Sequence, residues 1–375
     1  MLDKTKVIFS TAFTLTGTIV GAGFLGLPYA FMKSGFFIGL FWLIFLGIIL
    51  LLVDLYFGEI TLRTRAIHQI PGYSKKYLGR FLGKVTSLSM IFGIYSALIA
   101  YLIGEGQSLS QLFFGNTNYS LPLTIFFLFF MAILSRGGIK KLRGVEFFGV
   151  LSVIISIVLI SLIMYPNVKY ENFSFINFSK FFFPFGIVLF SFLGFNSIPE
   201  LRRELGRDTK MLKKAILIGA AIPIFLYIIF SFAVVGALGE KVSEIATLSF
   251  KGLFGKFLLL LGIFTMGTAF FSLSFALRDY LAFDLRKREL SFLCVYLIPF
   301  LLYSVFNFFG LFGFTKILGV GGAISGGITA IFILVMNIIS KKEGDRRPEY
   351  SIPINWFVIF ILGMVFLVGI ISEIF

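Results

Sequence analysis

Gly23-Phe24-Leu25-Gly26-Leu27-Pro28 and Gly194-Phe195-Asn196-Ser197-Ile198-Pro199 share the pattern Gly-Phe-x-x-(Leu/Ile)-Pro, and each stands inside a long apolar stretch. The two copies occupy matching places in the two halves of the 375-residue chain. Glycine and proline interrupt the hydrogen bonding of a helix, and hydrocarbon cannot satisfy the backbone groups that are freed, so such breaks persist where they face protein or a wet cavity. Paired breaks in corresponding segments are typical of the central binding site of a secondary transporter.

The composition excludes a soluble domain. The mean hydropathy is +0.99, 58% of the residues are hydrophobic and 14% are charged, whereas a soluble domain has about 25% charged residues. The single cysteine, Cys294, and the single histidine, His68, exclude a disulfide framework and a Cys/His metal site. No phosphate-binding loop of the Gly-x-x-x-x-Gly-Lys-Ser/Thr type is present.

Eleven apolar runs approach or exceed the roughly 20 residues that a membrane crossing needs. They cover 8–31, 35–59, 84–110, 121–135, 144–165, 181–200, 212–238, 254–278, 290–309, 311–339 and 353–374. The tenth run is rich in glycine, for which we expect close helix packing in preference to a hinge. The first run follows Lys4 and Lys6 but carries one of the paired breaks, so we expect a crossing and not a cleaved signal peptide.

The basic residues predict the orientation of the chain. Most of the 33 lysines and arginines fall in the segments that are cytoplasmic when the N-terminus is inside. This positive-inside bias predicts a cytoplasmic N-terminus and, with eleven crossings, an extracytoplasmic C-terminus. Contact with lipid headgroups explains the net charge of +15. We therefore expect the bilayer as a partner and no nucleic acid.

The paired breaks also indicate a kind of ligand. Gly21-Ala22-Gly23 would separate two half-helices, and the second of them would begin near Ala22 with free N–H groups that suit a carboxylate. A half-helix that ends near Ser191 would offer unpaired carbonyls that suit an ammonium group or a small cation. One site with both ends fits a zwitterion, and α-amino acids are the commonest small zwitterions. Phenylalanines around the breaks favour an apolar or aromatic side chain.

Several stretches resemble known permeases. The sequence from Thr16 to Ala30 resembles the first helix of amino acid/auxin permeases and of the neighbouring tryptophan/tyrosine permeases, and Pro184–Leu201 resembles their sixth helix. Ile70–Gly79 and Ala276–Leu281 add further similarity, so the resemblance covers nearly the whole chain. These families belong to the amino acid–polyamine–organocation superfamily.

The resemblance implies an all-α membrane protein with the leucine-transporter-like fold. In that fold two inverted five-helix repeats, with broken helices 1 and 6, are followed by an eleventh helix. Residues 1–165 would form the first repeat, residues 166–339 the second, and residues 340–375 a linker and the last helix. Eleven apolar runs agree with this architecture.

The resemblance further implies the roles of individual residues. The substrate carboxylate would meet the N–H groups of Ala22, Gly23 and Phe24, and the amine would meet the carbonyls of Leu189, Phe190 and Ser191. Phe195 and Asn196 would border the side-chain pocket. In sodium-coupled relatives, Na⁺ would lie between the carbonyls of Gly17 and Val20 and a Thr/Ser pair of the eighth helix, here Thr268 and Ala269. One hydroxyl of that pair is missing, and no lysine stands between Glu146 and Tyr165 to replace the sodium ion as in proton-coupled relatives.

Carboxylates at membrane depth are candidates for coupling transport to protons. Asp54 lies deep in the second run and Glu105 in the outer half of the third, and either would carry a proton, although an arginine contact or vestibule solvation would also explain them. Glu59, Glu146 and Glu200 lie near the cytoplasmic face, where we expect ion pairs or gate contacts.

These observations favour a secondary transporter for amino acids in the inner membrane, driven by H⁺ or Na⁺ symport through alternating access, without any other cofactor and without enzymatic activity. An amino acid sensor without net transport shares every motif. A membrane-embedded transferase lacks the polar catalytic groups it would need, and a passive channel suits paired breaks less well. The sequence leaves the oligomeric state open.

Overall fold

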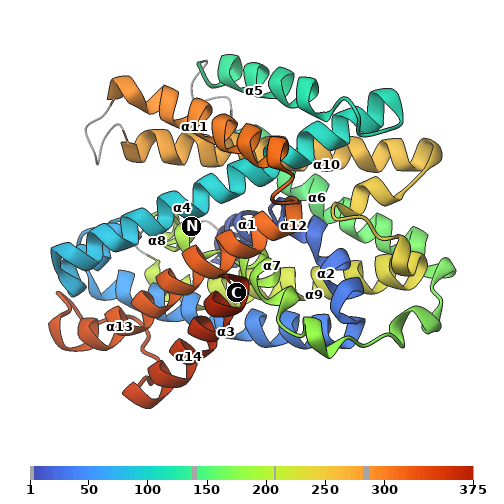
Figure 1. Cartoon of the computed structure of the whole chain (residues 1–375). Coiled ribbons are helices and arrows are strands. Elements are labelled where there is room, and N and C mark those ends of the chain that lie inside the picture. The colour runs from blue at the N-terminus through green and yellow to red at the C-terminus, as the bar shows by residue number, and fades with distance from the viewer. Residues whose placement is uncertain (1–3, 137–141, 207, 282–287, 375) are drawn as a thin grey trace.

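The computed structural model describes residues 4–136, 142–206, 208–281 and 288–374, and every regular element within these ranges is a helix (Figure 1). Eight helices are long and apolar enough to cross a membrane, a ninth crossing is a bent pair of helices, and two apolar helices are shorter. Within the described ranges they account for the eleven expected crossings, so the chain is a multi-pass membrane protein.

The helices fall into unbroken and interrupted crossings. The unbroken ones are α3 (Phe36–Arg63), α4 (Ile70–Phe114), α5 (Ser120–Arg136), α6 (Leu142–Met164), α9 (Leu212–Leu238), α10 (Gly252–Asp279), α11 (Arg288–Phe309) and α14 (Trp356–Ile374). The interrupted ones are α1 (Lys4–Ile19) with η1 (Ala22–Gly26) and α2 (Leu27–Ser34), and α7 (Phe183–Ser191) with η6 (Phe195–Ser197) and α8 (Ile198–Leu205). α12 (Phe314–Gly321), the π-helical turn η11 (Gly322–Gly326) and α13 (Gly327–Glu343) form one further continuous helical crossing.

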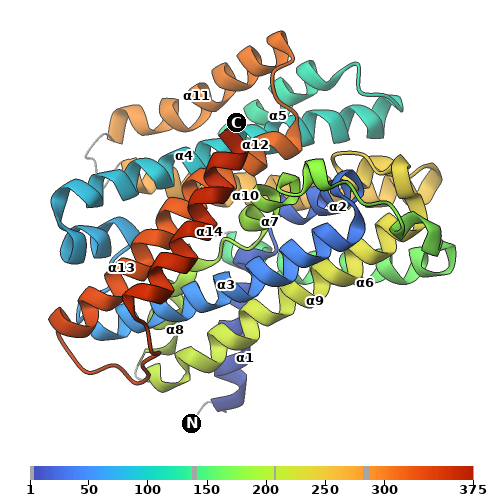
Figure 2. The same ribbon diagram turned by 60° about the horizontal axis from the view of Figure 1, so that its bottom comes forward.

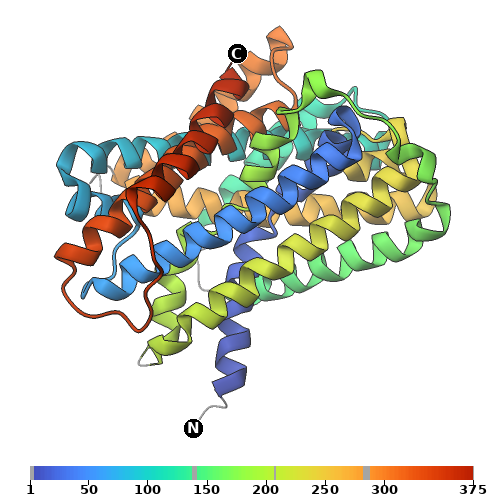
Figure 3. The same cartoon turned by 90° about the horizontal axis from the view of Figure 1, so that it is seen from below.

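The interrupted helices lie between two groups of unbroken ones. α9 packs along α1, α3 and α6, while α4 packs against α5, α10, α12 and α13. Figure 2 shows α3 beside α9 and α13 beside α14. α7 contacts α2, α3 and α12, and α1 contacts α8 and α9. The N-terminal part of α1 extends beyond the other helices (Figure 3).

α4 begins earlier than the apolar run 84–110 predicts. Residues Ile70–Leu78 already form a helix, with Pro71 in its first turn, where proline has no hydrogen bond to lose. Gly79 then has φ 89°, a conformation that glycine adopts without strain, and the chain turns there into the long membrane-spanning part. The polar residues of this first helix hide it from a search for apolar runs.

The glycines of the tenth crossing serve close packing, as expected. Gly322 lies in the π-helical turn η11, and a Cβ added there would stand 2.7 Å from Phe190 Cβ and even closer to the carbonyl oxygen of Gly186. A Cβ at Gly326 would stand 2.7 Å from Leu193. Because α7 and the residues that follow it approach this closely, there is no room for a side chain at Gly322 or Gly326.

Glu59 ties α3 to the connection between α13 and α14. Its side chain is fully buried and accepts hydrogen bonds from Lys341 Nζ at 2.9 Å, Ser351 Oγ at 2.7 Å and the N–H of Ile352 at 2.9 Å, and it pairs with Arg63 at 2.8 Å. The expected ion pair is confirmed for this residue. The side chain of Glu146 lies outside the described part of the chain.

Removing this carboxylate is expected to destabilise the protein. In Glu59→Ala, Lys341 and Arg63 lose a common buried partner, and loss of one member of a buried ion pair costs about 3–5 kcal/mol. Thermal unfolding of purified protein measures the effect. The matched control is Glu200→Ala, because Glu200 is exposed on α8 and its removal should leave the melting temperature nearly unchanged. Equal melting temperatures for the two variants would contradict the assigned role.

Candidate functional site

The first break lies between α1 and α2, where the sequence predicts it. α1 ends at Ile19, η1 begins at Ala22, and the two parts meet at an angle of 46°. Gly21 precedes η1 in an extended conformation, and no side chain caps the N-terminus of η1. The first N–H groups of such a helix have no partner within it, so they are available to an anion.

The second break has the opposite polarity. α7 ends at Ser191, three residues outside any helix follow, and the short helix η6 leads into α8, which begins at Ile198 with Pro199 in its first turn. The carbonyl end of α7 therefore points into the interior, where it carries the negative end of the helix dipole.

The two breaks touch one another. A Cβ added at Gly23 would stand 2.9 Å from Ser191 Oγ and 3.2 Å from Ser191 Cα. A Cβ added at Gly194 would stand 2.7 Å from Ile19 Cγ1. The prediction that both helices are interrupted and that the interruptions meet is confirmed. An uncapped N-terminus and a carbonyl end thus lie side by side within the bundle.

The carbonyls at the end of α7 already accept hydrogen bonds. The N–H of Phe192 donates to Leu189 O and the N–H of Leu193 donates to Phe190 O, both at 3.2 Å. The hydroxyl of Tyr227 donates to Ser191 O at 3.1 Å. Each oxygen keeps a second lone pair, so an ammonium group could still bind there as an additional donor.

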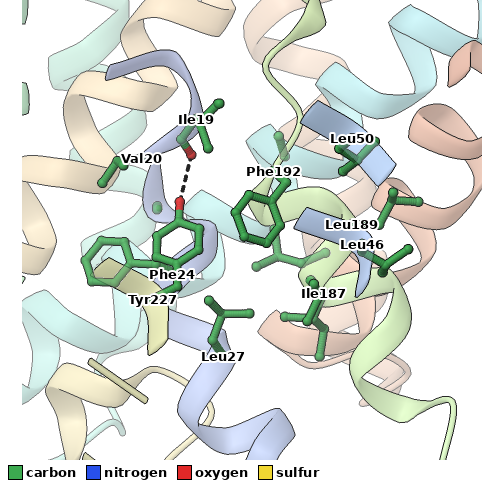
Figure 4. Packing of buried hydrophobic residues seen from close by; sticks show 14 of the residues in the cluster. Ile19, Val20, Phe24, Leu27, Leu46, Leu50, Ile187, Leu189, Phe192 and Tyr227 are labelled. Carbon is green, nitrogen blue, oxygen red and sulfur yellow. Dashed lines mark hydrogen bonds between the residues drawn. The ribbon is translucent and has the colours of Figure 1, made fainter. Parts of the chain in front are cut away.

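Tyr227 of α9 is central to the junction and was not found by sequence reasoning. Its ring is fully buried, and its hydroxyl lies 2.9 Å from Ile19 O (Figure 4). The same hydroxyl lies 3.1 Å from Ser191 O. The ring of Phe24, from the first break, stacks on the Tyr227 ring with the two centroids 6.3 Å apart. The ring of Phe192, from the second break, has its centroid 5.2 Å from that of Tyr227. Tyr227 therefore contacts both interrupted helices through its hydroxyl and through its ring.

Tyr101 of α4 is a second residue that sequence reasoning missed. It is 3% exposed, and a Cβ added at Gly21 would stand 3.8 Å from its hydroxyl oxygen. The chain has 52 phenylalanines and 14 tyrosines. In such a chain a tyrosine within an apolar run is a signal for a required hydroxyl, and this signal would have drawn attention to Tyr101 and Tyr227.

Two polar side chains beside the breaks are exposed. Thr18 on α1 and Asn196 next to α8 are exposed, although both lie beside the interruptions. Further along, the hydroxyl of Thr14 donates to the carboxylate of Glu204 at 3.2 Å. Phe195, by contrast, is 3% exposed. Phe195 and Asn196, which were expected to border one pocket, thus differ in exposure, because Asn196 is exposed and Phe195 is buried.

The three residues expected around a sodium ion do not share one set of neighbours. Gly17 faces α6, because a Cβ added there would stand 2.5 Å from Val150. Val20 is buried at the end of α1. Thr268 donates to Thr265 O at 3.0 Å and lines a pocket of about 380 Å³ whose other residues come from α4, α5 and α10. A sodium ion at Gly17, Val20 and Thr268 stays a prediction.

The two carboxylates expected to carry protons are both deeply buried. Asp54 is 1% exposed and its Oδ1 has no hydrogen-bond partner among the described residues. Glu105 is fully buried, and neither of its oxygens has a partner within the same part of the chain. Glu105 stands four residues after Tyr101, so the two share one face of α4 and lie one helical turn, about 5.4 Å, apart along the axis. Glu105 is therefore one helical turn along α4 from the tyrosine whose hydroxyl approaches the first break.

Comparison with solved structures supports the expected fold. The chain is 16% identical to MhsT in complex with L-phenylalanine, with a TM-score of 0.62 over 100% of this chain and 98% of that one. A manganese transporter of Eremococcus coleocola is 10% identical, with a TM-score of 0.68 over 99% of this chain and 87% of that one. These likenesses confirm the all-α, leucine-transporter-like fold.

Comparison of sequences gives the family. Tyrosine-specific transport system 1 of Haemophilus influenzae is 26% identical over 243 residues, and the alignment spans 63% of this chain and 59% of that protein's length. Glutamine transporter 2 of Aliivibrio fischeri is 25% identical over 365 residues, 92% of each chain. These relatives are transport proteins and not enzymes. The model of the tryptophan/tyrosine permease family matches residues 4–375, and the chain belongs to that family.

Proposed function

We propose that this protein is a secondary active transporter that carries amino acids, with apolar or aromatic side chains favoured, across the bacterial inner membrane by cation-coupled symport. The observation that carries the proposal is the meeting of the two breaks, which sets an uncapped helix N-terminus beside a helix C-terminus. These two ends complement the carboxylate and the ammonium group of one zwitterion.

In this proposal the substrate carboxylate binds the N–H groups of Ala22, Gly23 and Phe24. The ammonium group binds the second lone pairs of the carbonyl oxygens of Leu189, Phe190 and Ser191, whose first lone pairs are already used. Binding groups from both breaks then hold one ligand, which suits alternating access, in which the broken helices rock against the other helices.

The side-chain preference rests on the aromatic rings at the junction and on the relatives. Phe24 and Phe192 lie on the two breaks and pack on Tyr227. Tyrosine-specific and tryptophan-specific transport proteins are among the similar sequences. Glutamine is the second candidate substrate, because the glutamine transporter aligns with 92% of this chain.

The direction of access and the topology belong to the same proposal. With the N-terminus cytoplasmic and the C-terminus extracytoplasmic, Thr18, Asn196 and Glu204, which are exposed, would line a path from the breaks to the cytoplasm. The structure would then be an inward-facing conformation. Residues 1–165 and 166–339 would be the two inverted repeats that exchange orientation, followed by the linker and last helix at 340–375. We further propose that this chain is related to amino acid/auxin permeases and to their superfamily, because its sequence resembles their first and sixth helices.

We propose H⁺ as the driving ion, with Glu105 as its carrier and Asp54 as the alternative. An ionised carboxylate without a hydrogen-bond partner in a buried site costs several kcal/mol, and Glu105 is fully buried with no partner among the described residues. The alternative, with Na⁺ held by Gly17, Val20 and Thr268, has less support. The residues that line a pocket together with Thr268 belong to α4, α5 and α10, whereas Gly17 and Val20 belong to the α1 region.

Uptake into proteoliposomes tests the proposal. Purified protein is reconstituted, and accumulation of labelled tyrosine, tryptophan and glutamine is measured under an imposed pH gradient and, separately, an imposed Na⁺ gradient. We expect accumulation of an aromatic amino acid driven by the pH gradient and unaffected by Na⁺. Accumulation driven only by Na⁺ would favour the sodium version. Binding without any uptake would identify a sensor and contradict the transporter.

A further inference from the structure

One oxygen atom holds the ends of both broken helices. The hydroxyl of Tyr227 lies 2.9 Å from Ile19 O, at the end of α1, and 3.1 Å from Ser191 O, at the end of α7. A phenol has one proton to donate, so the two carbonyls share it. In Figure 4 the hydroxyl points from α9 directly to the end of α1.

The position of this oxygen is one that would suit a cation. Carbonyls at the C-terminal end of a helix carry partial negative charge, and the interrupted helices of transporters use such ends to coordinate Na⁺ or H⁺. Here two such ends converge within 3.1 Å of one point, and a hydroxyl group occupies that point. The shared proton supplies the partial positive charge that the two carbonyls require.

α9 also holds α1 at a second point, two turns before Tyr227. Pro223 has no N–H, so the carbonyl of Gly219 lacks its partner within the helix. The hydroxyl of Thr16 lies 3.0 Å from this oxygen and 3.1 Å from Ala12 O of its own helix, so these two carbonyls share its proton. α1 is therefore tied to α9 by Thr16 and by Tyr227, whereas the end of α7 is tied to α9 by Tyr227.

We propose that Tyr227 is a positioning residue that replaces a coupling cation at the junction of the two breaks. Its hydroxyl keeps Ile19 and Ser191 at the spacing that the substrate requires, and binding at this point therefore needs no Na⁺. This point is distinct from the sodium position expected from Gly17, Val20 and Thr268. The inference rests on the proposed function for the identity of the substrate, but the tie between the helices does not depend on it.

Tyr227→Phe tests the tie, because it removes the hydroxyl and keeps the ring that packs on Phe24 and Phe192. The matched control is Tyr303→Phe. Tyr303 is 2% exposed, and its hydroxyl accepts a hydrogen bond from Thr124, away from the breaks. Affinity for tyrosine, tryptophan and glutamine is measured by calorimetry on purified protein, in Na⁺ and in N-methylglucamine at one pH.

For the wild type we expect affinities that agree within about twofold in the two salts. Tyr227→Phe should bind about 10- to 100-fold more weakly in both salts, as the loss of a buried hydrogen-bond donor predicts, whereas Tyr303→Phe should bind like the wild type. Wild-type affinity in Tyr227→Phe would overturn the inference. So would a wild-type affinity that depends on Na⁺ and loses this dependence in Tyr227→Phe, since the hydroxyl would then be a ligand of the ion.

A second measurement needs no substrate. Val20 is 3% exposed and directly follows Ile19. In a Cys294→Ser background, the rate at which a maleimide labels Val20→Cys reports how often the end of α1 opens. Adding Tyr227→Phe should raise this rate at least fivefold, and adding Tyr303→Phe should leave it unchanged. An unchanged rate with Tyr227→Phe would overturn the tie. If the wild type bound no amino acid, the proposed function would be wrong. The labelling rate of Val20→Cys would still show whether the Tyr227 hydroxyl holds the two helix ends together.

Discussion

Gly23→Ala is expected to lower amino acid binding at least 100-fold while leaving membrane insertion intact. The added Cβ would stand 2.9 Å from Ser191 Oγ, 3.0 Å from Phe190 and 3.2 Å from Ser191 Cα. The Ser191 hydroxyl can rotate away from this Cβ, but Ser191 Cα belongs to the backbone and cannot, so Gly23 and Ser191 would have to move apart by a few tenths of an ångström. The two breaks would have to separate, and the groups that hold the carboxylate and the ammonium would no longer face one ligand.

The larger change Gly23→Leu should abolish binding altogether, since its side chain would also occupy the place of the substrate carboxylate. Gly363→Ala is the matched control. It makes the same chemical change in α14, where an added Cβ meets nothing within 4 Å. Binding is measured by calorimetry and insertion by the yield of folded protein from membranes. Near-normal uptake by Gly23→Ala would place the substrate elsewhere.

Glu105→Gln is expected to abolish accumulation against a gradient while exchange continues. Glutamine has nearly the same shape as glutamic acid but cannot release a proton, so a carrier with this change would cycle without moving H⁺. The binding groups at the breaks are unchanged, and exchange of internal for external labelled amino acid should stay within about threefold of the wild type. The steady-state accumulation ratio under an imposed pH gradient should fall to about one.

The surroundings of Glu105 explain why this residue is the stronger candidate. Glycines flank it, and a Cβ at Gly106 would stand 2.7 Å from Ser120 O, so α5 packs closely over this part of α4. A Cβ at Gly267 of α10 would stand 3.4 Å from Glu105 Oε1. The carboxyl is fully buried in this conformation, so a proton bound there would be held until the helices move.

Two variants serve as comparisons for Glu105→Gln. Glu240→Gln removes an exposed carboxylate after α9 and should accumulate amino acid like the wild type. Asp54→Asn tests the alternative carrier. In wild-type proteoliposomes uptake should rise as the external pH falls, because protonation precedes transport, and in Glu105→Gln exchange should lose this dependence. Full accumulation by Glu105→Gln would eliminate Glu105 as the carrier.

The breaks and the crossings could be read from the sequence, because each depends on local chemistry. Glycine and proline between Val20 and Pro28 weaken the hydrogen bonding of a helix, and the same holds between Ser191 and Pro199. Hydrocarbon in turn requires long apolar runs, so the eleven crossings were also predictable. The helix at Ile70–Leu78 was missed because its polar residues give no such signal.

The identity of neighbours across helices was decided by the tertiary structure. A helix turns about 100° per residue, so an error of one position in counting along the eighth crossing changes the face on which Thr268 lies. The convergence of Ile19 O and Ser191 O on the Tyr227 hydroxyl likewise depends on how α9 is rotated and how closely it approaches α1. The sequence alone determined that two helices break and where. Which side chain joins the broken ends depended on packing between residues far apart in the chain, and local patterns do not encode that packing.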